Sequence, residues 1–384
     1  MSRAQLRTKG TVLSYRILHI ADVHLEMAFG GREPSFGAKR RAQLCAAFER
    51  SLDLARERGV DAVCIAGDLY EDRHAGPDTA AYIRRHLSAL DPIRVFVSPG
   101  NHDPCMAGSV YKQMQPLPPN VIIFDARNFR AERLADGLTL WGMGQTSALD
   151  RARALAGFAC SGDGTNLLLF HGSDEEHMPP GKETIAPFNG AEIAHAGASH
   201  AMVGHFHGML QGPHHAYPGS PEPLNRNQDG EHTASIVTVD GGHVNVAFER
   251  LNKTRYVDSD LDVSAFGDSA ALVQAIREKA ASSIPNPGSV FCRLRLSGAA
   301  QASLDPDLHT LRTDMTLQYP GFELVEDYQA FDLDAIANEG NTVRAAFVAA
   351  MRERMAGTDD EELSVLQSAL RYGLLAFANK KLRA

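Results

Sequence analysis

The chain has 384 residues, of which 44% are hydrophobic and 22% are charged, and its 38 lysines and arginines stand against 47 aspartates and glutamates for a formal net charge of -9. This composition excludes a collagen-like, disordered or disulfide-scaffold protein, and the length leaves room for two or three domains. The five cysteines are scattered and form no CxxC pair, which argues against a thiolate zinc site. Because such cysteine usage fits a reducing compartment, and because we find neither a membrane-spanning apolar run nor a secretory signal, we expect a cytoplasmic protein.

The first 254 residues read as alternating strands and helices. Short apolar runs predict five buried strands, at residues 16–20, 61–66, 93–98, 167–170 and 201–203. Apolar side chains at helical spacing predict helices over residues 38–58 and 78–90. Two further runs, at 235–239 and 244–249, flank Asp240-Gly241-Gly242 and predict a β-hairpin. This alternation indicates an α/β domain whose sheet is covered on both faces.

The rest of the chain divides into parts of different character. We expect a polar N-terminal extension at residues 1–15, the α/β domain at 16–254, a small α+β capping domain at 255–341 and a helical hairpin at 342–384. The capping region contains a predicted helix and a predicted strand, at residues 269–281 and 290–296. The second helix of the hairpin carries leucines at helical spacing, namely Leu363, Leu366, Leu370 and Leu374. These leucines are either ordinary core or a surface that docks on a partner.

Polar side chains gather where the predicted strands of the first domain end. Their positions are Asp22, His24, Asp68, Asn101, His102, Asp103, His171, His205 and His207. The ends of strands in an α/β sheet feed one crevice, so we expect these side chains to meet. The D-x-H and H-x-H spacings put both members of a pair on one face of an extended chain, as paired ligands require.

This set of side chains predicts a centre with two metal ions. It offers nitrogen and oxygen ligands and no sulfur, which suits Mn, Fe, Zn or similar ions. Even seven ligands from this set of nine side chains are too many for one ion. Such a number suits two ions about 3.5–4 Å apart that share a carboxylate. Such a pair deprotonates a bridging water, clamps a phosphate and stabilises the charge of in-line displacement at phosphorus.

The same motifs resemble a known family. The sequence contains, in order, Asp22-x-His24, Gly67-Asp68, Gly100-Asn101-His102-Asp103, His171 and Gly204-His205-x-His207. Together they resemble the five signature motifs of calcineurin-like metallophosphoesterases. The segments ILHIADVHL, AGDLYED, VFVSPGNHDP and AYPGSPEP are most similar to the DNA-repair exonuclease branch, the SbcD-type nuclease subunit of double-strand-break repair complexes. The resemblance covers about residues 16–250 and implies a four-layer α-β-β-α sandwich.

The resemblance also implies a role for each site residue. One metal ion would be held by Asp22, His24, Asp68 and His207, and the other by Asp68, Asn101, His171 and His205. His102 would stabilise the transition state and give a proton to the leaving oxygen, with Asp103 orienting it. The expected ions are Mn²⁺, with Fe, Zn or Mg as alternatives. Some relatives carry a histidine at the position of Glu71, so a role of that histidine cannot be transferred.

The function implied by the resemblance is a metal-dependent DNA nuclease, exonuclease or endonuclease, that hydrolyses phosphodiester bonds with a metal-bridging hydroxide during DNA repair. The partners it implies are DNA, an SMC-like ATPase and a second copy of the chain. From the residue pattern we take the hairpin at 342–384 as the candidate docking element, and we expect no membrane partner. One alternative is a small-molecule phosphatase or cyclic-nucleotide phosphodiesterase on the same metal core. Another is a non-catalytic scaffold that binds DNA ends or the ATPase, against which the complete ligand set argues.

Several other polar residues can be interpreted as either structural or functional. We expect His19 to face the core and most remaining histidines to be solvated or packed. The loop residues His214 and His215 either approach substrate or are structural, and the turn at Tyr217–Pro221 either borders the cleft or is only a turn. The cluster Lys39-Arg40-Arg41 is either a solvated helix face or a contact with phosphates.

The negative charge is unevenly distributed. Residues 255–341 contain six basic and 14 acidic side chains, whereas residues 1–254 contain 25 basic and 28 acidic ones. The acidity therefore lies mostly in the expected capping domain and is weak evidence against DNA. Without a basic stripe, DNA affinity of the isolated chain should be modest and sensitive to salt.

Overall fold

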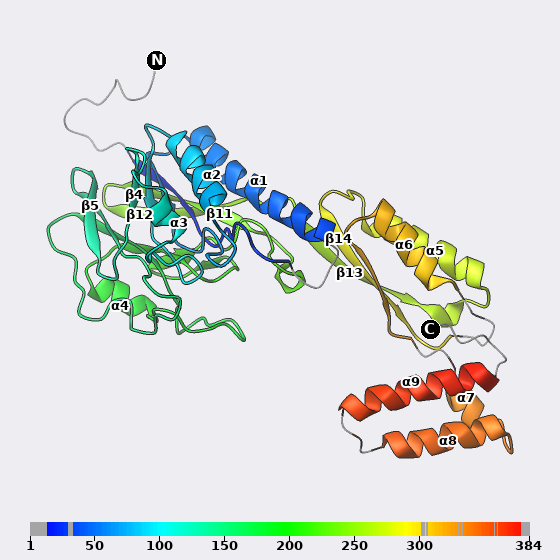
Figure 1. Ribbon diagram of the computed structural model, residues 1–384. Coiled ribbons are helices and arrows are strands. Elements are labelled where there is room, and N and C mark those ends of the chain that lie inside the picture. Colours follow the sequence, from blue (N-terminus) through cyan, green and yellow to red (C-terminus); the bar gives the residue numbers. More distant parts are fainter. Residues whose placement is uncertain are drawn as a thin grey trace. The chain divides into compact units, whose positions relative to one another are not determined.

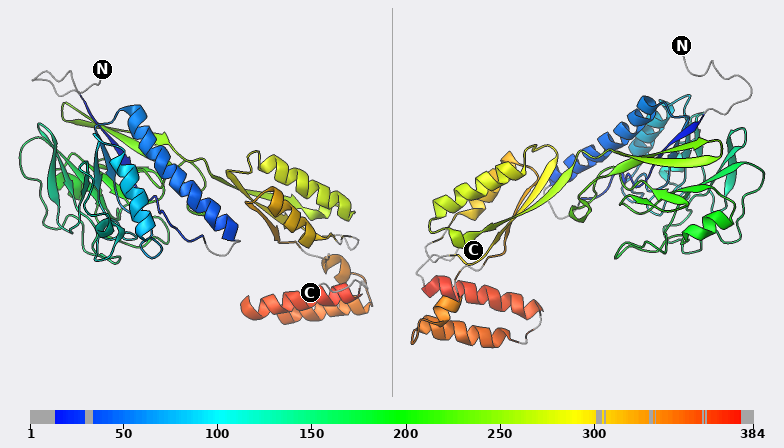
Figure 2. Two further views of the ribbon diagram at one scale, coloured as in Figure 1. Left: turned by 45° about the horizontal axis from the view of Figure 1, so that its top comes forward. Right: turned by 180° about the vertical axis from the view of Figure 1, so that it is seen from behind.

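The computed structural model describes residues 14–29, 34–300, 304, 306–328, 331, 333–356, 358 and 360–377. Within these residues the chain forms two compact units, one ending at Thr254 and the other beginning at Arg255. Each unit is described by itself (Figures 1 and 2). Most of the polar extension expected at residues 1–15 lies outside the described residues, and Tyr15 already belongs to the first strand.

Two six-stranded sheets form the first unit. One sheet has the order β12-β11-β1-β2-β3-β4 and comprises β1 (Tyr15–Ile20), β2 (Ala62–Ile65), β3 (Arg94–Val97), β4 (Val121–Ile123), β11 (Thr233–Asp240) and β12 (His243–Arg250). The other has the order β5-β6-β7-β8-β10-β9 and comprises β5 (Arg130–Ala135), β6 (Leu138–Gly142), β7 (Thr165–His171), β8 (His200–Gly204), β9 (Leu210–Gln211) and β10 (His215–Tyr217). Strands β1 to β4 run parallel, and so do β6, β7, β8 and β10. The hairpin β11–β12 pairs antiparallel with β1.

Alternation along the strands explains how the layers pack. In β1, Leu18 and Ile20 face a cluster that includes residues of the helices, whereas Ile17 belongs to the cluster shared by the two sheets. Helices α1 (Pro34–Arg58), α2 (Pro77–Ser88) and α3 (Val110–Gln113) pack on the first sheet, and Figures 1 and 2 show α1 and α2 side by side. Loops and the six-residue helix α4 (Gly190–His195) pack on the second sheet. The expected α-β-β-α order is therefore confirmed, with a thin fourth layer.

The five predicted strands, the two helices and the hairpin of this unit are all present. Helix α1 begins at Pro34, four residues before the predicted start. The five strand ends come from both β layers, because β1, β2 and β3 lie in one sheet and β7 and β8 in the other. Both kinds of strand are buried on both faces, so they look alike in the sequence. His171 closes β7 from within the strand, as its last residue.

The first part of the second unit consists of two successive β-α-β segments. Parallel strands β13 (Arg255–Asp262), β14 (Val290–Ser297) and β15 (Phe322–Glu326) alternate with α5 (Ser269–Ser283) and α6 (Leu308–Gln318). Both helices pack on the same three-stranded sheet (Figure 2) through a cluster that contains Leu272, Leu294 and Met315. Short 3₁₀ turns lie in each unit, at Arg226–Gln228 and Val263–Ala265.

The predicted helical hairpin is present in the last part of the chain. It consists of α8 (Val343–Met355) and α9 (Asp360–Phe377), preceded by the short α7 (Leu333–Ala337). Leu370 and Leu374 pack with Val348, with Ile336 of α7 and with Phe331 just before it. Leu366 is also buried. The core interpretation of these three leucines is confirmed. No helix of the described residues is long and apolar enough to cross a membrane.

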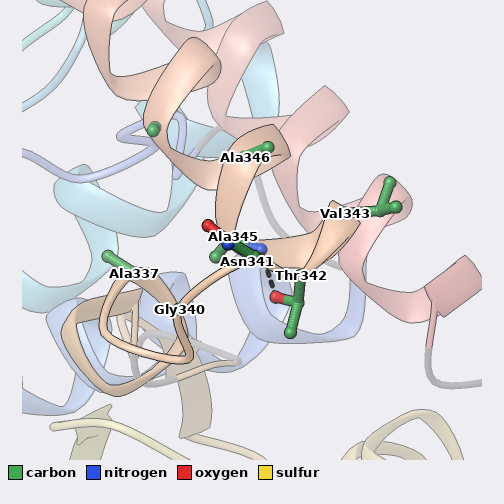
Figure 3. Close-up of a pocket in the computed structure, with 8 residues that line it drawn as sticks. Ala337, Gly340, Asn341, Thr342, Val343, Ala345 and Ala346 are labelled. Atoms are coloured by element: carbon green, nitrogen blue, oxygen red, sulfur yellow. Dashed lines mark hydrogen bonds between the residues drawn. The ribbon is translucent and has the colours of Figure 1, made fainter.

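A cavity of about 460 Å³ lies against α7 and the start of α8 (Figure 3). Its lining is Ala337, Gly340, Asn341, Thr342, Val343, Ala345, Ala346 and Ala349. The hydroxyl of Thr342 accepts a hydrogen bond from the backbone N–H of Ala345 and so caps α8. Since no lining residue carries a titratable side chain, this cavity offers no acid–base or metal chemistry.

Candidate metal centre

Four candidate ligands have a positive φ angle, a backbone conformation that residues other than glycine rarely adopt. The φ angles of Asp22, His24 and Asp68 are 54°, 52° and 51°, and that of His205 is 111°. Left-handed backbone at a residue with a side chain costs roughly 1–2 kcal/mol. Its repetition at the ends of β1, β2 and β8 turns each chain sharply out of its sheet, and residues held in this way cluster at functional sites.

Two motif positions have room only for glycine, because neighbouring backbone and side-chain atoms approach them closely. A side chain on Gly67, whose φ is +82°, would meet Nδ1 of His171 at 2.6 Å and Cα of Gly100 at 2.8 Å. A side chain on Gly100 would collide with Oδ1 of Asp68 and meet Cε1 of His171 at 3.0 Å. The glycines of GD and GNHD thus let the loops after β2 and β3 close around Asp68 and His171.

The structure brings the predicted ligands together in two clusters. One consists of Asp22, His24 and His207, and the other of Asp68, His171 and His205; in each, the ligand atoms lie within 4.8 Å of one another. Oδ2 of Asp68 lies 3.7 Å from Nε2 of His24 and 3.4 Å from Nε2 of His171, so this carboxylate stands between the clusters.

Asn101 completes the second cluster. Its side-chain oxygen lies 3.0 Å from Nε2 of His171. The loop after β3 that carries Asn101 also sends the backbone N–H of His102 to Oδ1 of Asp68, at 2.9 Å. All seven predicted ligands therefore meet where the ends of the two sheets come together.

Each of three imidazoles is held by one nitrogen and turns the other toward the centre. Nδ1 of His24 lies 2.7 Å from Oε1 of Glu71, Nδ1 of His171 lies 2.8 Å from the carbonyl of Ala66, and Nε2 of His205 lies 2.8 Å from the carbonyl of Glu183. A partner on the outer nitrogen fixes the tautomer in which the inner nitrogen is free to bind a metal.

Unsatisfied buried atoms test whether the residues fit a metal centre. Within the described part of the chain, Nε2 of His24, Oδ2 of Asp68 and Nδ1 of His205 are buried without a hydrogen-bond partner. Leaving a buried polar group unpaired costs roughly 1–3 kcal/mol, and all three atoms face the same place. Two imidazole nitrogens and a carboxylate oxygen are ligands for divalent cations, so the residues fit the expected centre.

The electrostatics agree with this chemistry. Burial lowers the pKa of His205 to about 3 and that of His207 well below its ordinary value, which keeps both lone pairs available. Burial raises the pKa of Asp22. Burial also opposes ionisation of Asp68, but the neighbouring His171 and His24 outweigh it and hold the pKa of Asp68 well below its ordinary value.

Glu71, to which no role was assigned from the sequence, links the centre to His102. Its Oε2 lies 3.0 Å from Nδ1 of His102, and its Oε1 holds His24. The bond to Glu71 is the main cause that raises the pKa of His102 to about 9. The His102 side chain is 42% exposed, unlike the buried cluster behind it.

The expected role of Asp103 as the residue that orients His102 is corrected by the structure. Asp103 is completely buried. Its carboxylate accepts the backbone N–H groups of Gly100, Asp68 and Leu69 and the hydroxyl of Tyr111. Asp103 therefore fixes the loops after β2 and β3, and Glu71 is the carboxylate that contacts the imidazole of His102.

His207 contacts residues from both earlier and later segments of the chain. Its Nδ1 lies 2.9 Å from the side-chain amide nitrogen of Gln228, and its Nε2 lies 3.8 Å from Oδ1 of Asp22 and 3.1 Å from Nζ of Lys182. Its carbonyl accepts the N–H of Ser220, so the turn at Tyr217–Pro221 is a buried support behind the ligand. Neither Lys182 nor Gln228 carried a sequence signal, because their role depends on neighbours distant in the chain.

A second carboxylate–imidazole network lies beside β7 and β10. Oδ2 of Asp174 lies 3.0 Å from Nε2 of His215 and 2.6 Å from Nδ1 of His177. The hydroxyl of Tyr217 accepts the N–H of Asp174 and donates to the carbonyl of Gly172. His215 is fully buried, so the structural interpretation holds for it.

Two other expectations about polar residues are settled by burial. His19 faces the core as expected, with Nδ1 3.1 Å from the hydroxyl of Ser235. Arg40 is completely buried and donates to the hydroxyl of Thr254 and the carbonyl of Pro223. The solvated and phosphate-binding interpretations are both wrong for Arg40.

Comparisons with known proteins identify the family that this chain resembles. A profile of the calcineurin-like phosphoesterase family matches residues 15–209. The uncharacterized metallophosphoesterase YhaO of Bacillus subtilis is 26% identical over 305 residues, which cover 74% of this chain and 72% of YhaO. The DNA double-strand break repair protein Mre11 of Methanopyrus kandleri is 30% identical over 233 residues, which cover 54% of this chain and 49% of that protein. The match thus spans about half the length of the Methanopyrus protein.

A solved structure, TT1561 of Thermus thermophilus, has a TM-score of 0.38 and 15% identity, and covers 62% of this chain and 99% of its own. The family match covers half of the chain and includes every predicted ligand from Asp22 to His207. These ligands form two clusters that fit a pair of metal ions. The chain therefore belongs to the calcineurin-like phosphoesterase family and is a phosphoesterase hydrolase.

Proposed function

We propose that this hydrolase is a metal-dependent DNA nuclease that acts in DNA repair. The observation that carries the proposal is the 30% identity over 233 residues to a double-strand break repair protein. The complete ligand set and the exposure of His102 support it, since a phosphate of a long polymer can reach His102 from solvent.

In this proposal the two clusters hold one ion each. Asp22, His24, Asp68 and His207 hold the first, and Asp68, Asn101, His171 and His205 hold the second, with Mn²⁺ as the expected ion. When bound, such a pair supplies a hydroxide nucleophile and neutralises the charge that develops on the phosphate. Asp68 is the shared ligand because its Oδ2 faces both clusters.

His102 supplies the proton for the leaving oxygen. Its Nδ1 is bonded to Glu71, which leaves Nε2 as the ring nitrogen that can reach a substrate atom. Glu71 therefore acts as a positioning residue, since one of its oxygens holds His102 and the other holds His24. Asp103 keeps the loop of His102 in place through its backbone bonds.

The activity test offers linear double-stranded DNA, single-stranded DNA and a small phosphodiester to the purified full chain with Mn²⁺. We expect DNA cleavage in the wild type and a loss of about 10²- to 10⁴-fold in His102→Ala, because a general acid contributes that much. His243→Ala, on the exposed start of β12, is the matched control and should behave as the wild type.

The outcomes separate the competing functions. Cleavage of the small ester alone would establish a small-molecule phosphodiesterase and refute the nuclease. Full activity of His102→Ala would refute the assigned proton donor. Binding of DNA ends without any hydrolysis would leave the non-catalytic scaffold as the remaining function.

An SMC-like ATPase is the proposed partner, docked on the helical hairpin. Val365 and Tyr372 of α9 are 65% and 47% exposed, and Val343 of α8 is 74% exposed. These side chains, rather than the buried leucines, form the proposed docking surface. Co-expression with the ATPase and pull-down tests it: deletion of residues 342–384 should abolish capture, and retained capture would refute it. Sedimentation of the chain alone would show whether it also forms a homodimer.

A further inference from the structure

Lys182 lies in the loop between β7 and α4 and reaches into the metal centre. Its Nζ is 3.1 Å from Nε2 of His207, and the lysine is half-buried. Burial is the main cause of the low pKa values of His205 and His207, and the charge of Lys182 lowers both further. The ammonium is therefore close to both ligand clusters.

The backbone next to Lys182 is anchored to the site. The carbonyl of Glu183 lies 2.8 Å from Nε2 of His205. The N–H of Ile185 donates to the hydroxyl of Ser173 at 2.9 Å, and the N–H of Ser173 donates to the carbonyl of Ile185 at 2.8 Å. The loop cannot move away from the ligands without breaking these bonds, whereas the four-carbon side chain of Lys182 can rotate.

The lysine and a metal ion compete for the same place. Nε2 of His207 can give its lone pair either to the ammonium or to an ion held with Asp22 and His24. Two cations at that position repel each other, so binding of an ion drives the ammonium outward. Its anchored backbone keeps it beside the site, and within the described residues no carboxylate forms an ion pair with it.

We propose that Lys182 is a substrate-binding residue whose ammonium contacts a non-bridging oxygen of the scissile phosphate once the metal ions are bound. This inference rests on the proposed phosphodiester hydrolysis. A positive charge that is displaced from a ligand and remains without a carboxylate partner suits an anionic oxygen, and it would add a charge-assisted hydrogen bond to the grip on the phosphate.

The inference has two consequences that can be measured without turnover. Lys182→Met keeps the apolar stem and removes the charge. Its Mn²⁺ stoichiometry should equal that of the wild type, and its Mn²⁺ affinity should be higher because the internal competitor is gone. Its dissociation constant for inorganic phosphate, measured on the Mn²⁺-loaded protein, should rise about tenfold or more.

The experiment is isothermal titration with Mn²⁺ and then with inorganic phosphate, beside hydrolysis of a small phosphodiester. Lys182→Arg keeps the charge and should retain most of the phosphate affinity. Lys112→Met removes a lysine paired with Asp125 elsewhere in the same unit and is the matched control. Melting curves of all variants show whether each protein is folded.

Wild-type phosphate affinity in Lys182→Met would overturn the inference, and so would loss of Mn²⁺ from this folded variant. If the wild type hydrolyses the diester and Lys182→Met binds phosphate normally, the inference alone fails. If the wild type cleaves neither DNA nor the small diester while Lys182→Met still weakens phosphate binding tenfold, the proposed function fails and the role of the lysine stands.

Discussion

The two units of the chain bury different kinds of side chain. The first unit buries aspartates, histidines, an arginine, amides and hydroxyls, among them Asp22, Asp68, Asp103 and His171. In the second unit, none of the described charged, histidine, amide, serine or threonine side chains is buried. Burying polar groups is costly unless they are paired or bind a ligand, so the first unit gives up stability for chemistry and the second does not.

This difference indicates what each unit depends on. Unpaired ligand atoms in the first unit gain partners when metal binds, and binding to the folded state stabilises it by about 2.7 kcal/mol at a free concentration of 100 times the dissociation constant. The second unit depends on clusters of apolar side chains. Mn²⁺ should therefore slow hydrogen exchange in the first unit only.

Asp68→Asn should produce the largest effect, because it removes the charge of the shared ligand. We expect hydrolysis at the level of the metal-free protein, fewer than two Mn²⁺ ions per chain and no protection of the first unit by Mn²⁺. Hydrogen exchange of the second unit should be unchanged. Two tightly bound ions in this variant would contradict the shared role of Asp68.

Leu294→Ala is the matching change in the second unit. Leu294 is completely buried in β14, so the cavity should destabilise that unit by about 2–5 kcal/mol in a denaturant titration. Binding of Mn²⁺ should remain as in the wild type. Leu317→Ala, at an 80% exposed position of α6, should cost little and serves as the control. Loss of metal binding in Leu294→Ala would show that the units are not independent.

Glu71→Gln should weaken the first unit's chemistry without unfolding it. The amide keeps the shape and loses the charge that holds His24 and His102, and loss of such an outer partner costs about 10- to 100-fold in metal affinity or activity. Metal titration and steady-state kinetics check this. Glu278→Gln on the exposed side of α5 is the charge-matched control, and equal behaviour of both variants would refute the role of Glu71.

Acid should affect the first unit through His19, a buried histidine outside the ligand set. Burial lowers the pKa of His19 to about 3 from 6.5, so the unfolded chain takes up a proton below pH 6.5 and the folded chain does not. The resulting loss amounts to about 2 kcal/mol between pH 7 and pH 5. Relative to His19→Gln, the wild type should lose this amount in denaturant titrations. An unchanged difference between the two proteins would contradict it, and the exposed His243→Gln should show no such shift.

The sequence patterns predicted the long buried strands well and missed several short or polar ones, such as β5, β6, β9 and β10. Strands such as β2 and β7 are continuous apolar runs, so their burial is visible in the sequence. Strand β5, RAERLA, is half-exposed and charged, and only its pairing with β6 makes it a strand. The division into two sheets was not visible from the residues themselves. The hydrophobicity of a strand indicates that it is buried, but not which other strand it pairs with.

The ligands of the candidate site were predicted from the sequence, but the residues that contact and position them were not. Asp22 to His207 stand at strand ends, a position that is readable from the sequence and from the family motifs. Glu71 contacts a residue 31 positions away, and Lys182 contacts one 25 positions away, so neither could be inferred locally. Asp103 was misassigned because it follows His102 directly, whereas its carboxylate faces the backbone on the other side.

The left-handed backbone at Asp22, His24, Asp68 and His205 has a consequence for evolution and engineering. Glycine at any of these positions would relieve backbone strain while deleting a ligand. A screen for heat resistance carried out without metal would not penalise the loss of a ligand, so any thermostabilised variant has to be selected for turnover at the same time.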